Sequence, residues 1–264
     1  MIVTTAGRTN LQMTQYANQI AKDLEIPFII RNKKSIIDIQ KLHNDDVFVV
    51  GKNRLEIYPV NQSSPLFFHP NSAMFRIKRV LKGSEDPLVD ISELQKGKRF
   101  LDCTLGLGSD SIVASLVVGS TGKVIGLEGN KYLAYIIKEG LTAWGSGDTE
   151  IDCAMKNIEV IHSDYLDYLK TCPDNAFDIV YFDPMFEEEI DSDGIKGLKQ
   201  LALRTTLSLS VIEEAIRVAN EKVIMKDHWK SNRFQELGFT VLKRKSAKFH
   251  FGVIEIQKRN STLV

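Results

Sequence analysis

Cysteine is scarce in this sequence, and none of the cysteines stands in a motif. The chain has 264 residues and three cysteines, Cys103, Cys153 and Cys172. No CxxC pair occurs, and no cysteine stands near a histidine at a spacing typical of metal ligands. This pattern argues against a disulfide framework and against a metal centre. We therefore expect three reduced thiols in a cytoplasmic protein.

An excess of charge of one sign is also missing, as are long apolar runs. Lysine plus arginine and aspartate plus glutamate each number 34, so the formal net charge is zero. Binding to a polyanion must then come from local patches. No window approaches 18 uninterrupted apolar residues, so we expect no membrane span. The start, MIVTTAGRTN, lacks the basic region and apolar stretch of a signal peptide, and we expect none.

The remaining composition is that of a globular protein, with 43% hydrophobic and 26% charged residues. The length fits one large α/β domain, alone or with a smaller unit. The sequence GSEDP at 83–87 interrupts the pattern. We predict a boundary there. Residues 1–86 would form a small mixed α/β extension that recognises substrate or caps the site, and residues 87–264 the main domain.

Within the extension, we predict a short strand at 2–4 and a helix from about 13 to 24, begun by a capping box of Thr9 and Gln12. Residues 46–58 alternate around Lys52 and predict a hairpin. Another helix is predicted to begin at Asn71 or Ser72. It carries several basic residues up to position 82, which suit either a solvated face or an RNA-facing one.

Beyond the boundary, strands and helices alternate regularly. Strands are predicted at 99–106, 123–129, 158–164, 177–183 and 221–228, and helices at 109–118, 130–144, 206–219 and 232–237. Such alternation predicts a parallel sheet covered on both faces. The last strands, 239–245 and 249–257, follow each other directly and predict an antiparallel hairpin at one edge. Sheets of this kind bind ligands outside the carboxyl ends of their strands.

The first two strand ends carry a glycine turn and an acid. The first strand ends in DCTLGLGSD, where Gly106 and Gly108 permit a tight turn before a helix N-terminus. The second ends in LEG, where Glu128 is placed to accept both hydroxyls of a ribose. A plain architectural turn and an exposed acid at a strand end explain each feature singly. Together they predict a ligand that contains a nucleoside.

The third and fourth strand ends carry further acids. Asp164, in HSDY, is placed either to accept from an adenine amine or to cap a helix over 165–170, and the sequence favours neither. The fourth strand ends in YFDPMF. Asp183 would accept hydrogens from an amine, Phe186 would stack on its base, and Pro184 would stiffen the turn between them. A strand-ending turn with a core phenylalanine is the plain structural alternative.

The motifs DCTLGLGSD, LEGN, VIHSD and YFDPMF occur in the order seen in class I S-adenosylmethionine-dependent methyltransferases. More narrowly, over roughly 97–257 the chain resembles the bacterial small-subunit rRNA guanine-N2 methyltransferases that share DPMF. The resemblance implies a Rossmann-like, mostly parallel sheet with an antiparallel final strand, and S-adenosylmethionine as cofactor. The cofactor-binding residues it implies are Asp102, Thr104, Gly106, Gly108, Ser109, Asp110, Glu128, Gly129, Asp164, Tyr165 and Asp183. Asp183, Pro184 and Phe186 would form the catalytic motif.

Charged residues around the predicted cleft bear on the substrate. Basic residues cluster at 226–233 and 243–248, and from these and the 76–82 helix we predict Arg76, Lys226 and Lys245 as substrate contacts, together with Phe186. Solvated strand and helix ends explain the same residues without RNA. Five acids follow DPMF within 187–193, and they suit a cationic or neutral substrate.

The sequence thus predicts an S-adenosylmethionine-dependent N-methyltransferase that modifies guanine N2 in small-subunit rRNA, with rRNA or the small ribosomal subunit as partner. A methyltransferase for a protein or small-molecule amine is a second interpretation. An NAD-dependent oxidoreductase is a third, which DPMF and Ser111, in place of the third fingerprint glycine, disfavour. A non-catalytic RNA-binding protein is a fourth. A homodimer is compatible with the sequence but not indicated by it.

Overall fold

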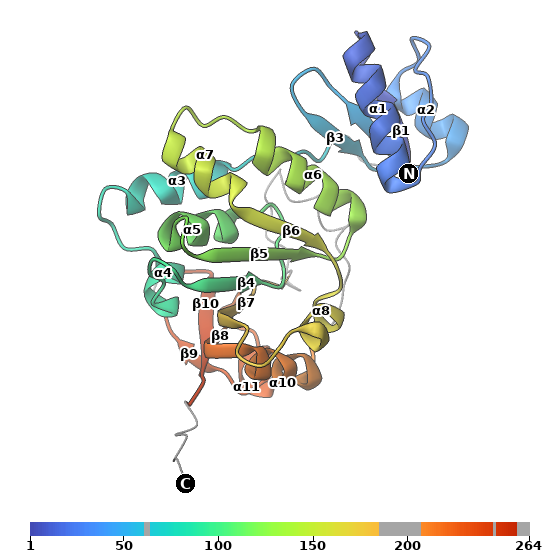
Figure 1. The fold of residues 1–264 in the computed structure, drawn as a ribbon. Coiled ribbons are helices and arrows are strands. Elements are labelled where there is room, and N and C mark those ends of the chain that lie inside the picture. Colours follow the sequence, from blue (N-terminus) through green and yellow to red (C-terminus); the bar gives the residue numbers. More distant parts are fainter. Residues whose placement is uncertain (61–63, 185–206, 245–246, 258–264) are drawn as a thin grey trace.

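The computed structural model describes residues 1–60, 64–184, 207–244 and 247–257 (Figure 1). Phe186, Lys245 and the acidic segment 187–193 lie outside these ranges, so the predictions made for them stay predictions. In the part of the chain that is described, no helix combines the length and the apolar character needed to cross a membrane.

The N-terminal residues form a small sheet of three strands, β1 (Ile2–Thr5), β2 (Val47–Val50) and β3 (Leu55–Tyr58). β1 runs parallel to β2, and β2 pairs antiparallel with β3 as the predicted hairpin. The helices of this unit are α1 (Leu11–Leu24) and α2 (Ile36–His43). Figure 1 shows the unit to one side of the larger sheet, next to α6 (Lys131–Ala143).

Three helix starts differ from the sequence predictions. α1 is capped by Asn10, whose side chain accepts a hydrogen bond from the Met13 N–H at 2.8 Å, so the predicted Thr9–Gln12 capping box is wrong. α3 (Asn71–Val80) begins after Pro70 and has no side-chain cap, so neither Asn71 nor Ser72 caps it. The sequence analysis missed α2, which has a true capping box between Ser35 and Asp38.

The large sheet has seven strands in the order β6-β5-β4-β7-β8-β10-β9. Its strands are β4 (Arg99–Asp102), β5 (Lys123–Glu128), β6 (Ile158–His162), β7 (Phe177–Phe182), β8 (Ala219–His228), β9 (Thr240–Leu242) and β10 (Phe249–Glu255). The first five in this order are parallel, whereas β10 runs antiparallel to both β8 and β9. This confirms the predicted Rossmann-like α/β sheet with its antiparallel edge.

Helices cover both faces of this sheet. Successive strand residues point to opposite faces, so Phe100 and Leu101 of β4 belong to two separate hydrophobic clusters. One cluster includes side chains of α5 (Ser109–Val118), α6 (Lys131–Ala143) and α7 (Thr149–Lys156). The other includes side chains of α8 (Tyr165–Thr171), α10 (Leu209–Val218) and α11 (Arg233–Glu236). The sequence analysis did not predict α7 or the short α4 (Pro87–Ser92).

Polar contacts between α1 and α6 attach the N-terminal unit to the large sheet. The Tyr16 hydroxyl donates to Glu139 at 2.5 Å, the Tyr135 hydroxyl donates to Asp23 at 3.1 Å, and the Lys131 ammonium donates to the Leu24 carbonyl. Further along the chain, α3 and α4 both contact α5. Residues 71–92 thus pack with the large sheet, while the predicted domain boundary after residue 86 stays a prediction.

Candidate active site

The turn between β4 and α5 is shaped by glycines and held by the last residue of β4. Gly106 and Gly108 have φ of 51° and 75°, the left-handed region that glycine adopts without strain. The buried Asp102 accepts hydrogen bonds from the Thr104 N–H at 3.0 Å and the Ser111 hydroxyl at 2.7 Å. Ser111, at the position of the missing third glycine, therefore fixes the carboxylate that anchors the turn.

Glu128 ends β5 beside this turn and is 9% exposed. Its carboxylate accepts a hydrogen bond from the Asn130 N–H at 3.0 Å. Burial raises the pKa of Glu128 to about 7, although the backbone N–H groups of Asn130, Gly106 and Gly129 oppose the rise. Burial likewise raises the pKa of Asp102 to about 7. Two buried acids therefore lie at the carboxyl ends of the neighbouring strands β4 and β5.

At the end of β6, Asp164 caps α8 by accepting from the Leu166 N–H at 2.8 Å and the Asp167 N–H at 3.3 Å. The structure therefore contains the helix cap that the sequence left open, and a contact with adenine stays a prediction. The ring of Tyr165 is buried and packs edge-on against Phe182, with ring centroids 5.9 Å apart. Its side chain thus belongs to the core beneath the site.

The DPMF motif begins where β7 ends, and Asp183 is held there from two sides. Its backbone N–H donates to the Thr104 hydroxyl at 2.6 Å, which joins the ends of β7 and β4. Its carboxylate accepts from the Lys226 ammonium of β8 at 2.5 Å. The Asp183 side chain is 26% exposed, so the acid is partly accessible to solvent. Pro184 follows and is half-buried.

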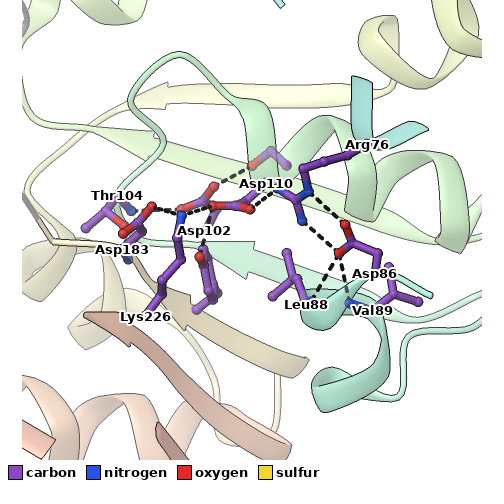
Figure 2. A network of polar contacts seen from close by, with 11 residues as sticks. Arg76, Asp86, Leu88, Val89, Asp102, Thr104, Asp110, Asp183 and Lys226 are labelled. Atoms are coloured by element: carbon purple, nitrogen blue, oxygen red, sulfur yellow. Dashed lines mark hydrogen bonds and ion pairs between the residues drawn. The ribbon is translucent and has the colours of Figure 1, made fainter. Parts of the chain in front are cut away.

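A line of alternating charges runs inward from Asp183. Lys226 also pairs with Asp110 of α5 at 3.2 Å, and Asp110 in turn accepts from the Tyr181 hydroxyl at 2.9 Å. The Arg76 guanidinium of α3 pairs with Asp110 and with Asp86, the latter through two contacts of 2.8 Å. Figure 2 shows this network extending from Thr104 and Asp183 through Lys226, Asp110 and Arg76 to Asp86.

The charges of this network stabilise one another. Burial alone would raise the pKa of Asp110, but Lys226 and Arg76 hold it well below its usual range. Burial alone would lower the pKa of Lys226, but Asp110 and Asp183 raise it. Burial raises the pKa of Asp183, and Lys226 opposes that rise. Three carboxylates against two cations leave one surplus negative charge in the network.

Two predicted substrate contacts lie inside this network. The sequence predicts that Arg76 and Lys226 face RNA phosphates, but in the structure Arg76 pairs with the buried Asp86 and Asp110, and Lys226 pairs with Asp110 and the partly exposed Asp183. Asp86 and Tyr181, for which the sequence predicts no role, complete the network. Asp86 precedes a proline and caps α4, a local signal that does not reveal its distant ionic partner.

Arg76→Met tests whether Arg76 supports the fold. The substitution leaves Asp86 and Asp110 short of a buried cation, which is expected to lower the free energy of unfolding by about 3 kcal/mol. Lys78→Met, on the exposed side of the same helix, is the matched control and should change it by less than about 0.5 kcal/mol. Urea titration measures both. Equal small effects would show that Arg76 is a replaceable surface cation.

The residues around the glycine turn fit a nucleoside cofactor. Gly108 stands at the N-cap of α5, whose first N–H groups lie beside the turn, and Ser109 begins the helix. The buried Glu128 carboxylate is a suitable acceptor for ribose hydroxyls, whose hydrogen bonds would offset its burial. No group of three or more potential metal ligands occurs among the residues whose placement is described.

Comparisons with known proteins find S-adenosylmethionine-dependent methyltransferases. The family model described as "Putative SAM-dependent methyltransferase" matches residues 34–251. The chain is 46% identical over 255 residues to YpiP of Bacillus subtilis (strain 168), covering 96% of this chain and 99% of that protein. It is 27% identical over 166 residues to ribosomal RNA small subunit methyltransferase J of Legionella pneumophila (strain Philadelphia 1), covering 61% of this chain and 65% of that protein.

Among solved structures, an S-adenosylmethionine-dependent methyltransferase from Neisseria gonorrhoeae aligns over 100% of this chain and 99% of its own. The TM-score is 0.62 at 14% sequence identity, a likeness of fold. The family match spans both the glycine turn and the DPMF motif. This chain therefore belongs to the S-adenosylmethionine-dependent methyltransferases and takes S-adenosylmethionine as its cofactor.

Proposed function

We propose that this methyltransferase modifies an exocyclic amine of a base in structured RNA, guanine N2 of small-subunit rRNA being the specific candidate. The observation that carries the proposal is Asp183, a partly exposed carboxylate fixed by Thr104 and Lys226 at the end of β7. The name of the Legionella relative supports an rRNA substrate, and hence the small ribosomal subunit as partner and the cytoplasm as location.

The chemistry of a base amine explains why an acid is needed here. Such an amine is planar and weakly nucleophilic because its lone pair is conjugated with the ring. A carboxylate that accepts its hydrogens orients the amine and stabilises the positive charge that develops on nitrogen as the new bond forms. The bound cofactor supplies an electrophilic methyl carbon. The Asp183 carboxylate would therefore stand where positive charge appears, and the excess proton leaves to water.

In this proposal the cofactor is held by the residues at the ends of the first three parallel strands. Glu128 would accept from the ribose hydroxyls, and the turn of Gly106 and Gly108 would let the backbone approach the ligand. Asp164 and the backbone of Tyr165 would border the adenine. Asp102 would act through the shape of the turn, since Thr104 and Ser111 occupy its two oxygens.

Methyl transfer from labelled S-adenosylmethionine tests the substrate class. Small ribosomal subunits, naked rRNA, tRNA and a protein extract are offered in parallel, with Asp183→Ala as the inactive control. The proposal predicts label in rRNA or in the small subunit, and none with the variant. Label that appears only in protein would contradict the RNA substrate and favour a methyltransferase for protein amines.

A further inference from the structure

An exposed tryptophan stands beyond the end of β8, on the same side as the active site. Phe182 of β7 pairs with Met225 of β8, so Asp183 and Lys226 lie at one level of the sheet. Trp229 comes three residues after Lys226 and is thus at most about 10 Å further along. Trp229 is 51% exposed, and its backbone N–H donates to the Lys248 carbonyl at 3.2 Å. The turn that carries it is therefore tied to the start of β10.

Cations lie over Trp229 and over Phe249, which pairs in the sheet with His228, the residue before Trp229. The Lys230 ammonium lies 5.1 Å from the centre of a Trp229 ring. Phe249, at the start of β10, has the Lys226 ammonium 5.1 Å from its ring centre and the Arg244 guanidinium 5.0 Å from it. The Phe249 ring therefore contacts both Lys226, whose ammonium holds Asp183, and Arg244, which lies outside the active site.

One of these cations has an unused donor. Within the described part of the chain, the Arg244 Nη1 atom is buried and makes no hydrogen bond. Arg233, the next cation after Lys230 along the chain, has its acceptors, because Asp227 accepts two of its hydrogen bonds at 2.7 and 2.9 Å. A buried guanidinium nitrogen without an acceptor is costly, and an anionic oxygen is the acceptor it favours. Arg244 thus keeps unused hydrogen-bonding capacity next to the Phe249 ring, which pairs in the sheet with the residue before Trp229.

We propose that Trp229, with Lys230 beside it and Arg244 over the neighbouring Phe249 ring, binds an unpaired nucleotide next to the methylated one in the RNA substrate. The indole would stack on the neighbouring base, and the two cations would contact its phosphates. A base must be unpaired and unstacked to lie on a side chain in this way, so the target is a loop or single-stranded segment. This inference rests on the proposed RNA substrate.

Fluorescence gives a direct test, because the chain has only two tryptophans. The other, Trp144, packs edge-on against Phe68, with ring centroids 6.2 Å apart, at the C-terminal end of α6. Trp144→Phe leaves Trp229 as the sole reporter, and Trp229→Phe leaves Trp144. A short single-stranded RNA containing guanosine, added with S-adenosylhomocysteine, should quench the first variant and leave the second unchanged. Quenching of Trp144 alone would overturn the proposal.

Kinetics give a second readout with the RNA that accepts label in the transfer assay. Trp229→Ala is expected to raise the KM for RNA by about 10- to 100-fold, while the KM for S-adenosylmethionine stays unchanged. Trp229→Phe should recover part of the loss, and Trp144→Phe should match the wild type. A normal KM for RNA in Trp229→Ala would overturn this inference and leave the proposed function intact. Wild-type protein that methylates no RNA would overturn both.

Discussion

Replacing Asp183 by alanine is expected to lower the rate of methyl transfer by about 100-fold or more, because the amine loses the acceptor that orients it. Affinity for S-adenosylhomocysteine should remain largely intact, since the proposed ribose acceptor, Glu128, lies at the end of another strand, β5. Single-turnover transfer measures the first effect, and titration calorimetry the second. A folded Asp183→Ala protein with wild-type turnover would remove Asp183 from the reaction.

Asp183→Asn sharpens this test because it keeps the shape of the side chain. The Lys226 ammonium can only donate, so it is expected to take the amide oxygen of the asparagine. The amide NH₂ would then face the substrate amine, and two donors would meet where a donor and an acceptor are needed. The asparagine variant should therefore be about as inactive as the alanine variant. Activity near that of the wild type would show that the charge and acceptor capacity of Asp183 are dispensable.

The second large effect concerns Glu128 and pH. The folded-state pKa of Glu128 is raised from 4.5 to about 7, so between these values the folded protein keeps a proton that the unfolded chain releases. Stability of the cofactor-free protein must then fall as pH rises through this window. Glu128→Gln removes that dependence. The difference in unfolding free energy, variant minus wild type, should rise by about 2 kcal/mol from pH 5 to pH 8.

Cofactor binding should show the opposite preference at the same residue. Ionised Glu128 is the stronger acceptor for ribose hydroxyls, so wild-type affinity for S-adenosylhomocysteine should increase as pH rises through about 7. In Glu128→Gln the affinity should be at least about 10-fold lower at pH 8, and this Glu128-dependent increase should be lost. Asp102 titrates in both proteins, so it cancels in the comparison. An unchanged affinity would exclude Glu128 from the cofactor site.

Local sequence patterns predicted the sheet and which candidate site residues lie at the ends of its strands. The alternation of apolar strands and helices predicted a parallel sheet, and the direct succession of the last two strands predicted the antiparallel hairpin at its edge. Asp102, Glu128 and Asp183 could be assigned to one edge of the sheet. Asp102 and Glu128 end their strands, Asp183 directly follows its strand, and parallel strands bring such ends together. These features depend on neighbouring residues, which a sequence displays directly.

The directions of the charged side chains could not be predicted in this way. Arg76 lies 34 residues before Asp110, and Lys226 lies 116 residues after it. Helical spacing shows that α3 has one apolar stripe, but it does not show which of the remaining residues face α5. Arg76 was assigned to RNA for that reason, although it stabilises buried carboxylates. The helices α4 and α7 were not predicted, because six and eight residues are too few for a clear helical periodicity.

We propose that Asp183 orients an exocyclic amine for methylation. The most direct measurement is nucleoside analysis by mass spectrometry of rRNA labelled by the wild-type protein, with Asp183→Ala in parallel. N2-methylguanosine is expected in the wild-type reaction and should be absent from the reaction with the Asp183→Ala variant. Label in a ribose 2′-O-methyl group or on a ring carbon, or N2-methylguanosine formed equally by both proteins, would contradict it.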